Sequence, residues 1–424
     1  MSDQQRKEIL VYSHPSVLKE PILMGMLNTT IVRGKEIFAF EYSPEFLESN
    51  SVFEIDPNLK LYKGTQYISN QERNFGMFLD SSPDRWGRVL MDRREAMKAR
   101  LNDQPQQRLV ESDYLLGVYD ESRMGALRFK TDKEGPFLDN DPNYPTPPMT
   151  SLRELEHATL DLEQDEPIND EEYLKRLALL IAPGSSLGGT RPKASVISED
   201  EQLWIAKFPS KNDDIDMGAW EYLAYKLALK CGIDMSESTA EKFYSDQTTF
   251  LTRRFDRDES GRRKHFFSAM TLLGYLDGAD AASGVSYIEL LELIITRGSN
   301  VEYDTEQLWR RIVFNILVSN TDDHLRNHGF LLDQNGIILS PAYDINPNPK
   351  GYGLNLNIDE NDNRLDTEIA GNVAPLFRLS NSKASMIIDE MKEVVSSWRT
   401  EAKKLKITRQ EMEFMATAFG GKDL

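Results

Sequence analysis

The chain has 424 residues, of which 40% are hydrophobic and 28% charged, a composition typical of soluble globular proteins that excludes collagen, coiled coils and extensive disorder. Fifty basic against 69 acidic residues give a net charge of −19, which disfavours binding to nucleic-acid phosphates as the main activity of the chain. The single cysteine, Cys231, excludes internal disulfides and cysteine-built zinc sites, and the lack of a long apolar run predicts a cytoplasmic protein without membrane contact.

The first part of the chain predicts a mixed α/β region. Residues 25–40 alternate apolar and polar side chains around Arg33-Gly34-Lys35, which predicts a hairpin whose second strand is 36–42. The segment 80–83, an aspartate and two serines followed by a proline, is expected to end a loop and cap a helix. That helix turns four arginines outward on a face that we interpret as solvated: Arg85, Arg88, Arg93 and Arg94.

Two further segments separate this region from the next. Five prolines within residues 131–151 can continue neither a helix nor a sheet and predict a domain boundary. Residues 154–172 carry nine acidic side chains without lysine or arginine, which predicts an exposed helix and loop.

The second part has clearer periodicity. Apolar residues at helical spacing predict a helix over 173–181 that ends at Pro183-Gly184, and alternation predicts strands over 193–198 and 203–208. Asp214 or Asp216 is expected to cap the next helix, which ends near Gly232. A wide apolar stripe behind Thr305 as the expected cap predicts a buried helix up to residue 317, and a hairpin follows at 329–339.

Three motifs in this part bear on chemistry. Residues 184–193 (GSSLGGTRPK) form a glycine-rich segment, and such backbones can approach a phosphate closely, although a plain connection is the commoner reading of one glycine loop. Lys207 is predicted on a strand and Glu221 on the helix that follows it. If the lysine points inward, its charge needs an anionic partner, which Glu221 and nucleotide phosphates could supply. Alternatively, Lys207 lies at an edge of the sheet and its side chain reaches water.

The third motif is the most informative. Asp322 and Asn327 are five residues apart, and Asp344 follows after the predicted hairpin. Protein kinases need a carboxylate that accepts the proton of the incoming hydroxyl, an amide oxygen on magnesium five residues later, and a second carboxylate on magnesium. Each residue alone is more typical of a capped loop, but the ordered set with the glycine loop, Lys207 and Glu221 favours a kinase-like site.

At this point the chain resembles a known family. Five segments look like the motif series of the HipA-like serine/threonine-protein kinase toxins of type II toxin-antitoxin systems: GSSLGGTRPKA (184–194), WIAKFP (204–209), LTRRFDR (251–257), NTDDHLRN (320–327) and PAYDINP (341–347). PDRWGR (83–88) and LLGVYDESRMGALRF (115–129) extend the likeness to the amino-terminal part. The resemblance implies an α+β, two-lobed protein-kinase-like fold with an amino-terminal α/β subdomain and a mostly helical C-terminal lobe, divided as 1–135, 150–257 and 258–424.

The resemblance also implies roles for single residues, with ATP and Mg²⁺ as cofactors. Asp322 would be the catalytic base, Asn327 and Asp344 the magnesium ligands, and Lys207 the contact to the α-phosphate region, supported by Glu221. His324 would contact the nucleotide or brace its loop. The remaining nucleotide-binding residues would be Gly188, Gly189, Thr190, Arg191, Pro192 and Lys193 over the phosphates and Arg253, Arg254 and Phe255 at the adenine. The family often has an acidic residue or glutamine before the loop lysine, whereas this chain has Arg191-Pro192.

Regulation and partners follow from the same resemblance. Ser186 matches the serine that such kinases autophosphorylate as an off switch. The resemblance implies a small helix-turn-helix antitoxin as the partner, with DNA contacted only through it. It also implies an aminoacyl-tRNA synthetase as the expected class of protein substrate. A small-molecule kinase of the same fold, or a catalytically silent partner-binding or repressor component, remains an alternative.

Overall fold

The structure is a computed structural model that describes residues 6–49, 54–69, 72–138, 146–163, 173, 177, 180, 189 and 191–420. The chain forms two compact units. Unit 1 comprises Met1–Lys211, Phe243–Ser245 and Asp256–Phe267, and unit 2 comprises Asn212–Lys242, Asp246–Phe255 and Ser268–Leu424. The three-part division expected from the sequence stays a prediction. Among the described residues, no helix is both long and apolar enough for a membrane span.

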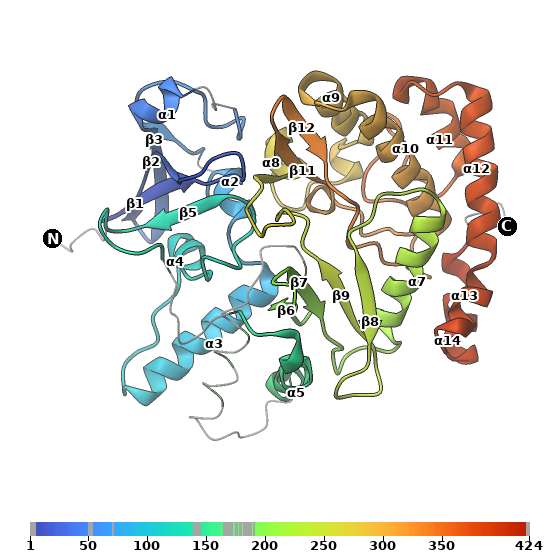
Figure 1. The fold of residues 1–424 in the computed structure, drawn as a ribbon, viewed down its shortest axis with the longest axis horizontal. Coiled ribbons are helices and arrows are strands. Elements are labelled where there is room, and N and C mark those ends of the chain that lie inside the picture. The colour runs from blue at the N-terminus through green and yellow to red at the C-terminus, as the bar shows by residue number, and fades with distance from the viewer. Residues whose placement is uncertain are drawn as a thin grey trace. The chain divides into compact units, whose positions relative to one another are not determined.

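An antiparallel sheet forms the first part of unit 1 (Figure 1). Its strand order is β4-β3-β2-β1-β5, with β1 Arg6–Ser13, β2 Ile22–Val32, β3 Lys35–Tyr42, β4 Gln66–Tyr67 and β5 Leu127–Lys130. Arg33 and Gly34 connect β2 to β3 with φ angles of 52° and 78°, the left-handed pair that a two-residue hairpin turn favours. The predicted hairpin is confirmed.

The helices of unit 1 are α1 Pro44–Glu48, α2 Gly76–Asp80, α3 Arg85–Leu101, α4 Glu111–Leu116 and α5 Leu152–Glu163, and η1 (Met149–Ser151) is a 3₁₀ turn. The expected loop before α3 contains the short helix α2, and the cap of α3 is Asp84, whose side chain accepts from Gly87 N. The arginine face is less solvated than expected. Arg88 forms two hydrogen bonds with Glu111, and Arg93 donates to the carbonyl of Leu162.

The acidic stretch is also less exposed than expected. In α5, Leu155 and Leu162 are buried, and Glu156 is fully buried and accepts a hydrogen bond from Ser245 N. The loop expected after α5 lies outside the described residues. So does most of the helix expected over 173–181, of which Tyr173, Leu177 and Leu180 are described and helical.

Strands β6 (Lys193–Ile197) and β7 (Leu203–Lys207) form the predicted antiparallel hairpin. Lys193 pairs with Lys207 in its register, so the first residue of β6 lies opposite the last residue of β7. Strand β10 (Phe266–Ser268) contains the end of unit 1 and the first residue of the next segment of unit 2.

Unit 2 is mostly helical, as expected of the C-terminal lobe (Figure 1). Its helices are α7 Met217–Lys230, α8 Ala269–Leu273, α9 Tyr287–Arg297, α10 Val301–Leu317, α11 Thr367–Val373, α12 Asn381–Ser396, α13 Trp398–Lys404 and α14 Arg409–Phe414, with 3₁₀ turns η2 Ala281–Ser283, η3 Leu325–Asn327, η4 Ala374–Phe377 and η5 Met415–Ala418. Its hairpins are β8 (Ser238–Glu241) with β9 (Thr249–Arg253), and β11 (Gly329–Asp333) with β12 (Gly336–Leu339).

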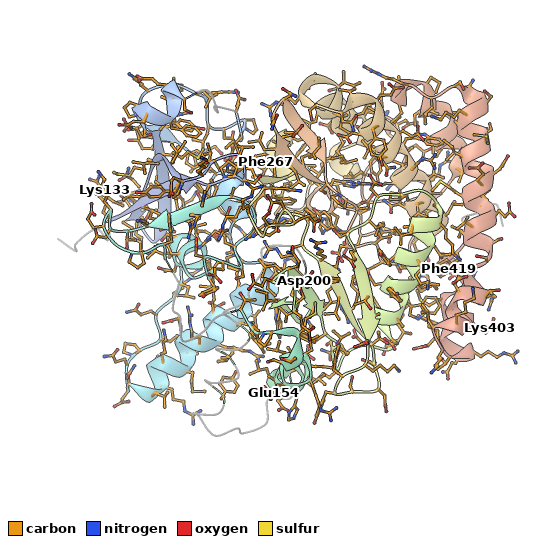
Figure 2. All side chains as sticks on the ribbon, viewed as in Figure 1. Lys133, Glu154, Asp200, Phe267, Lys403 and Phe419 are labelled. Atoms are coloured by element: carbon orange, nitrogen blue, oxygen red, sulfur yellow. The ribbon has the colours of Figure 1, made fainter. Side chains whose placement is uncertain are left out.

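Helix caps and aromatic packing fix these helices. Asp216 caps α7 by accepting from Ala219 N, which selects one of the two expected cap residues. Trp220 of α7 packs with Trp398 and Phe419, whose rings stack at 4.5 Å; Phe419 is labelled in Figure 2.

The start of α10 differs from the sequence-based expectation. The helix begins after Asn300, and Thr305 is a buried residue of its second turn whose hydroxyl donates to the Glu302 carbonyl. The polar residues of the first turn conceal the true start, because the apolar stripe begins only after Thr305.

Candidate active site

The loop 320–328 begins where α10 ends in unit 2. The helix is anchored by buried side chains that include Leu308, Ile312 and Leu317, and it packs against α9, α11 and α12. After it, Ser319 has a left-handed backbone (φ 50°), and Asn320 N donates to the carbonyl of Asn315 over 2.9 Å. The chain therefore leaves the helix in a defined direction.

Two adjacent aspartates of this loop have different surroundings. Asp323 is buried, its Oδ2 accepts from Asn315 Nδ2 at 2.7 Å, and its Oδ1 lies 2.8 Å from His328 Nε2. Asp322 is exposed. The carboxylate of Asp323 therefore braces the loop, and the carboxylate of Asp322 is the one that a substrate can reach.

Asn327 is oriented by its own loop. Its side-chain Nδ2 donates to the main-chain carbonyl of Asp322 over 2.9 Å, and His324 N donates to the same carbonyl over 3.0 Å. Because the amide nitrogen makes this bond, the amide oxygen is the atom of Asn327 suited to a cation. The spacing of five residues thus brings the expected base and the expected metal ligand into direct contact.

Asp344 lies on a segment that is tied to this loop. On one side of it, the Tyr343 hydroxyl donates to the Arg326 carbonyl over 2.6 Å. On the other side, Asn346 N donates to Asn320 Oδ1 over 3.2 Å, and Asn346 Nδ2 donates to Asp344 Oδ1 over 2.9 Å. Asp344 itself has a left-handed backbone with φ 58°, an uncommon conformation that these flanking contacts hold.

These oxygen donors fit a magnesium ion. Mg²⁺ prefers oxygen ligands and is usually held by one or two carboxylates together with substrate phosphates. Asn327 and Asp344 offer one amide oxygen and one carboxylate. No group of three or more histidine, cysteine, aspartate or glutamate side chains suited to a metal occurs within the described residues.

His324 offers a second test of the nucleotide site. Its Nδ1 atom is buried, and within the described part of the chain it has no hydrogen-bond partner. A buried polar atom without a partner costs free energy, so a ligand that bonds to it gains affinity. Both expected roles of His324, the nucleotide contact and the loop brace, stay predictions.

Unit 1 contains the residues expected around the phosphates. Ser186, Gly188 and Thr190 lie outside the described residues, and Gly189 has φ 111°, a conformation that suits glycine. Lys207 is half-buried at the end of β7. Lys193 has a partner that sequence reasoning missed: its Nζ lies 2.8 Å from Asp84 Oδ2. Its expected role over the phosphates stays a prediction.

The expected adenine contacts lie at the end of β9 in unit 2. Arg253 N donates to the Glu237 carbonyl over 2.8 Å, and Arg254 is buried. The ring of Phe255 lies 5.3 Å from that of Tyr343, so it packs beside the segment that carries Asp344. Glu221 is buried on α7, and its pairing with Lys207 of unit 1 stays a prediction.

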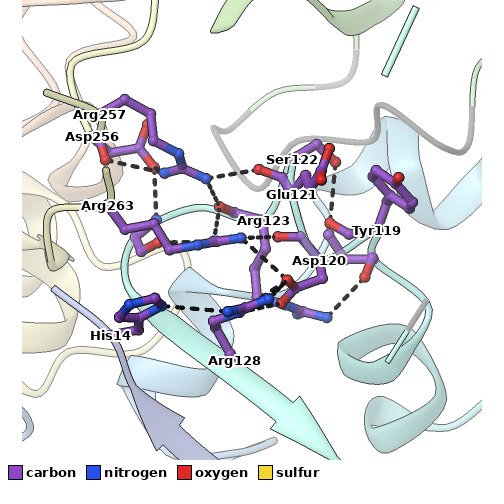
Figure 3. A network of polar contacts seen from close by, with 12 residues as sticks. His14, Tyr119, Asp120, Glu121, Ser122, Arg123, Arg128, Asp256, Arg257 and Arg263 are labelled. Carbon is purple, nitrogen blue, oxygen red and sulfur yellow. Dashed lines mark hydrogen bonds and ion pairs between the residues drawn. The ribbon is translucent and has the colours of Figure 1, made fainter. Parts of the chain in front are cut away.

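The next two residues of the LTRRFDR motif, Asp256 and Arg257, belong to a buried network in unit 1 (Figure 3). Asp256 Oδ2 accepts from Gly125 N and from Arg257, and Arg257 also donates to the carbonyls of Glu121 and Arg123. Sequence reasoning quoted both segments as motifs but did not pair them, since their partners are more than 130 residues apart.

Asp120 is the second carboxylate of this network. Burial raises the pKa of Asp120, but Arg263 and Arg128 lower it more, so the net direction is downward. Burial lowers the pKa of Arg263 to about 10 despite the opposing charge of Asp120. Backbone carbonyls of residues 120, 123 and 125 accept from Arg263 as well, which compensates for the excess of arginines.

Comparisons with known proteins bear on the family and the fold. A curated Haemophilus influenzae protein described as "Putative kinase" is 27% identical over 194 residues, which are 41% of this chain and 56% of that protein, so the match spans little more than half of the relative. Two solved structures were found by structural comparison, and only the first has a TM-score high enough to indicate a shared fold. A chain of the Shewanella oneidensis toxin-antitoxin complex of HipA, HipB and operator DNA has 18% identity and a TM-score of 0.61, with 97% of this chain and 94% of that chain covered. The proinflammatory kinase CtkA of Helicobacter pylori has 15% identity and a TM-score of 0.33, with 51% and 95% covered.

The similarity to the chain of the Shewanella oneidensis complex confirms the expected mixed α/β, two-lobed, kinase-like fold class. The family model described as the HipA-like C-terminal domain matches residues 185–398, just over half of the chain. That span includes β6, β7, loop 320–328 and Asp344. The chain belongs to the HipA-like family.

Proposed function

We propose that the chain is an ATP- and Mg²⁺-dependent serine/threonine-protein kinase. The observation that carries the proposal is the arrangement of loop 320–328, in which Asp322 is exposed, Asn327 is oriented by the Asp322 carbonyl, and Asp344 lies on a segment bonded to the same loop. Membership of the HipA-like family and the similarity to a kinase-named relative support it.

The residues divide the chemistry between them. Asp322 accepts the proton of the acceptor hydroxyl and orients its oxygen toward the γ-phosphorus. Asn327 Oδ1 and the Asp344 carboxylate hold Mg²⁺, which when bound neutralises the charge on the phosphate oxygens. Lys207 adds a positive charge at the phosphates. Phosphoryl transfer of this kind needs little covalent catalysis by the protein, so these residues contribute mainly by positioning the reactants.

The metal-binding part of the proposal is tested by Asp344→Asn. Removal of the carboxylate should abolish Mg²⁺-dependent transfer, while calorimetry should still detect nucleotide binding. Asp389→Asn, an exposed aspartate of α12, is the matched control. Full transfer activity with unchanged Mg-ATP affinity in Asp344→Asn would rule out Asp344 as a ligand.

Ser186, which lies outside the described residues, is proposed as the autophosphorylation site. A phosphate there adds about −1.5 to −2 charges beside the triphosphate, so repulsion opposes nucleotide binding. Peptide mass spectrometry after incubation with Mg-ATP tests this role. It fails if Ser186 stays unmodified in an active enzyme, or if the phosphorylated form binds ATP as tightly as the unmodified one.

The biological role that we propose is the toxin of a toxin-antitoxin pair. A small helix-turn-helix antitoxin with a basic surface would be complementary to the net charge of −19 on this chain. In the complex, the antitoxin would be the protein that contacts DNA. An aminoacyl-tRNA synthetase is the proposed class of substrate. Overexpression should arrest growth, and a co-expressed antitoxin should relieve the arrest and co-purify. A chain that hydrolyses ATP but is harmless would instead favour a small-molecule kinase.

A further inference from the structure

Three asparagines of unit 2 connect the two segments that carry the proposed catalytic groups. Asn315 lies near the end of α10, Asn320 begins the loop 320–328, and Asn346 follows Asp344 by two residues. Asn315 and Asn320 are only 2% and 1% exposed, and Asn346 is half-buried. Buried amides need hydrogen-bond partners, so their contacts show what the three side chains hold in place.

The hydrogen bonds of these asparagines form an unbroken series. Asn315 Nδ2 donates to Asp323 Oδ2 over 2.7 Å, and Asn320 Nδ2 donates to Asn315 Oδ1 over 3.1 Å. Asn346 N donates to Asn320 Oδ1 over 3.2 Å, and Asn346 Nδ2 donates to Asp344 Oδ1 over 2.9 Å. This series, which we call the asparagine relay, runs from the carboxylate next to the proposed base to the carboxylate of the proposed metal ligand.

The direction of each bond in the relay follows from groups that have a single role. The main-chain N–H of Asn346 can only donate, so it faces the oxygen of Asn320, and the amide nitrogen of Asn320 is left to donate to Asn315. Asn315 then presents its own nitrogen to Asp323, whose carboxylate accepts. The two ends of the relay thus select the same orientation for both buried amides.

Helix α10 anchors more of the site than the relay alone. Asp304, Arg311 and Asn315 are buried at intervals of seven and four residues, which places them on one side of the helix. Asp304 Oδ2 accepts from Leu339 N over 2.9 Å, and Arg311 Nη2 donates to the Ser340 carbonyl. One side of α10 therefore holds the end of β12, where the segment with the proposed metal ligand begins, as well as the loop 320–328.

The relay ends on a carboxylate whose main chain has an uncommon conformation. Asp344 has a left-handed backbone with φ 58°, and the bond from Asn346 to its Oδ1 atom limits the rotation of the carboxylate. A side chain that is already aligned loses less conformational freedom when a cation binds, so the affinity for the cation is higher. Loss of a link in the relay should therefore weaken cation binding without removing a ligand.

We infer that Asn320 is a positioning residue for the magnesium site, because it couples the carboxylate of Asp344 to the loop that carries Asp322. This inference rests on the metal-binding part of the proposed function. Asn320 acts through Asn346 and is not itself a ligand. Its loss should lower the affinity for the metal more than it lowers the stability of the fold.

The test measures metal binding directly, with Mn²⁺ as the probe. Mn²⁺ is titrated into the full chain with a non-hydrolysable ATP analogue, and water-proton relaxation distinguishes protein-bound metal from the free metal–nucleotide complex. Asn320→Ala removes the two central bonds of the relay, and Asn346→Ala removes its last side-chain bond. Each variant should raise the Kd for Mn²⁺ by about 10- to 100-fold. The Mg²⁺ concentration for half-maximal phosphoryl transfer should rise in parallel.

Two asparagines of unit 2 outside the relay are the matched controls. Asn357 is 3% exposed and its Nδ2 donates to the Ala281 carbonyl over 2.9 Å, whereas Asn363 is half-buried and its Nδ2 donates to the Leu354 carbonyl over 2.6 Å. Asn357→Ala and Asn363→Ala should lower the thermal stability about as much as the relay variants and leave the Kd for Mn²⁺ unchanged. A merely structural role would move stability alone.

Two results overturn the inference, and a third separates it from the kinase function. If the wild-type chain binds no Mn²⁺ with the analogue, the metal site and the relay are both wrong. If it binds Mn²⁺ but the folded relay variants keep the wild-type Kd, or the controls raise it as much, Asn320 is not a positioning residue. If the wild-type chain binds Mn²⁺ but transfers no phosphate, the kinase function alone fails, and a raised Kd in the relay variants still supports the inference. Asn346→Ala decides the matter if Asn320→Ala does not fold, since its side chain is half-buried.

Discussion

Lys193 Nζ lies 2.8 Å from Asp84 Oδ2, and the two side chains are only 3% and 2% exposed. The other carboxylate oxygen, Asp84 Oδ1, accepts from Gly87 N over 2.8 Å and caps α3. Trp86 Nε1 also donates to the Lys193 carbonyl over 3.1 Å. The last residue of the glycine-rich segment is therefore held by the N-terminal end of a helix more than one hundred residues earlier in the chain.

The first prediction concerns this pair. Asp84→Asn keeps a capping oxygen but removes the charge, so it leaves the Lys193 ammonium buried without its carboxylate. We expect the free energy of unfolding to fall by about 3–5 kcal/mol in urea denaturation. The matched control is Asp216→Asn, a cap residue of α7 whose charged neighbour, Lys242, is exposed and 3.8 Å away. That control should lose about 1 kcal/mol or less, and equal losses in the two variants would contradict the account.

The second prediction concerns the network in Figure 3. Asp120→Asn removes a buried carboxylate that faces Arg128 and Arg263, and should cost about 3–5 kcal/mol of unfolding free energy near pH 7. Asp258→Asn breaks an exposed pair with Arg262 and should cost less than about 1 kcal/mol.

The pH dependence of the Asp120 effect has a defined sign. The pKa of Asp120 is lowered in the folded chain, so its stabilisation is present above the unfolded pKa and is lost as pH falls through the folded pKa. The difference between Asp120→Asn and the unmodified chain should therefore be constant from pH 7 to about 5 and shrink below about 4. A difference that grows on acidification would show that the carboxylate is not the stabilising group.

The third prediction concerns His265, which is buried with its Nε2 atom 2.8 Å from Ser13 Oγ. Burial lowers the pKa of His265 from 6.5 to about 4. Between these values the unfolded chain binds the proton and the folded chain does not, so stability falls as pH drops from about 6.5 to about 4. The full difference corresponds to roughly 3 kcal/mol.

The measurement is urea denaturation of the unmodified chain and of His265→Gln at pH 7 and pH 4.5. His265→Gln should lose less stability than the unmodified chain between the two pH values, because glutamine does not titrate there. Parallel losses in both proteins would mean that His265 does not set the acid sensitivity.

Local patterns predicted much of the fold. The hairpins β2–β3, β6–β7 and β11–β12 follow from alternation of side chains and from turn residues, both of which are encoded within a few positions. Asp322, Asn327 and Asp344 could be chosen from spacing for the same reason. The structure adds that Asp323 is buried and Asp322 is exposed, a difference that the sequence of two adjacent aspartates does not show.

Long-range partners could not be predicted in this way. The charges on Arg88 and Lys193 indicate that each needs an anion when buried, but nothing local specifies Glu111 or Asp84. Glu156 belongs to an acidic stretch whose composition predicts exposure, yet it is buried and accepts a hydrogen bond from Ser245 N, 89 residues later in the chain. Such pairs depend on topology, which a single sequence does not encode locally.

If Asp322 is the catalytic base, Asp322→Ala removes the group that accepts the proton, and phosphoryl transfer from Mg-ATP by this variant measures the loss. The loop is braced by Asp323, so this variant should keep the thermal stability of the unmodified chain, with Asp389→Ala as the matched control for loss of an exposed aspartate. We expect transfer to fall by about 10²–10⁴-fold in Asp322→Ala and to stay unchanged in Asp389→Ala. Transfer at the unmodified rate by a folded Asp322→Ala protein would contradict it.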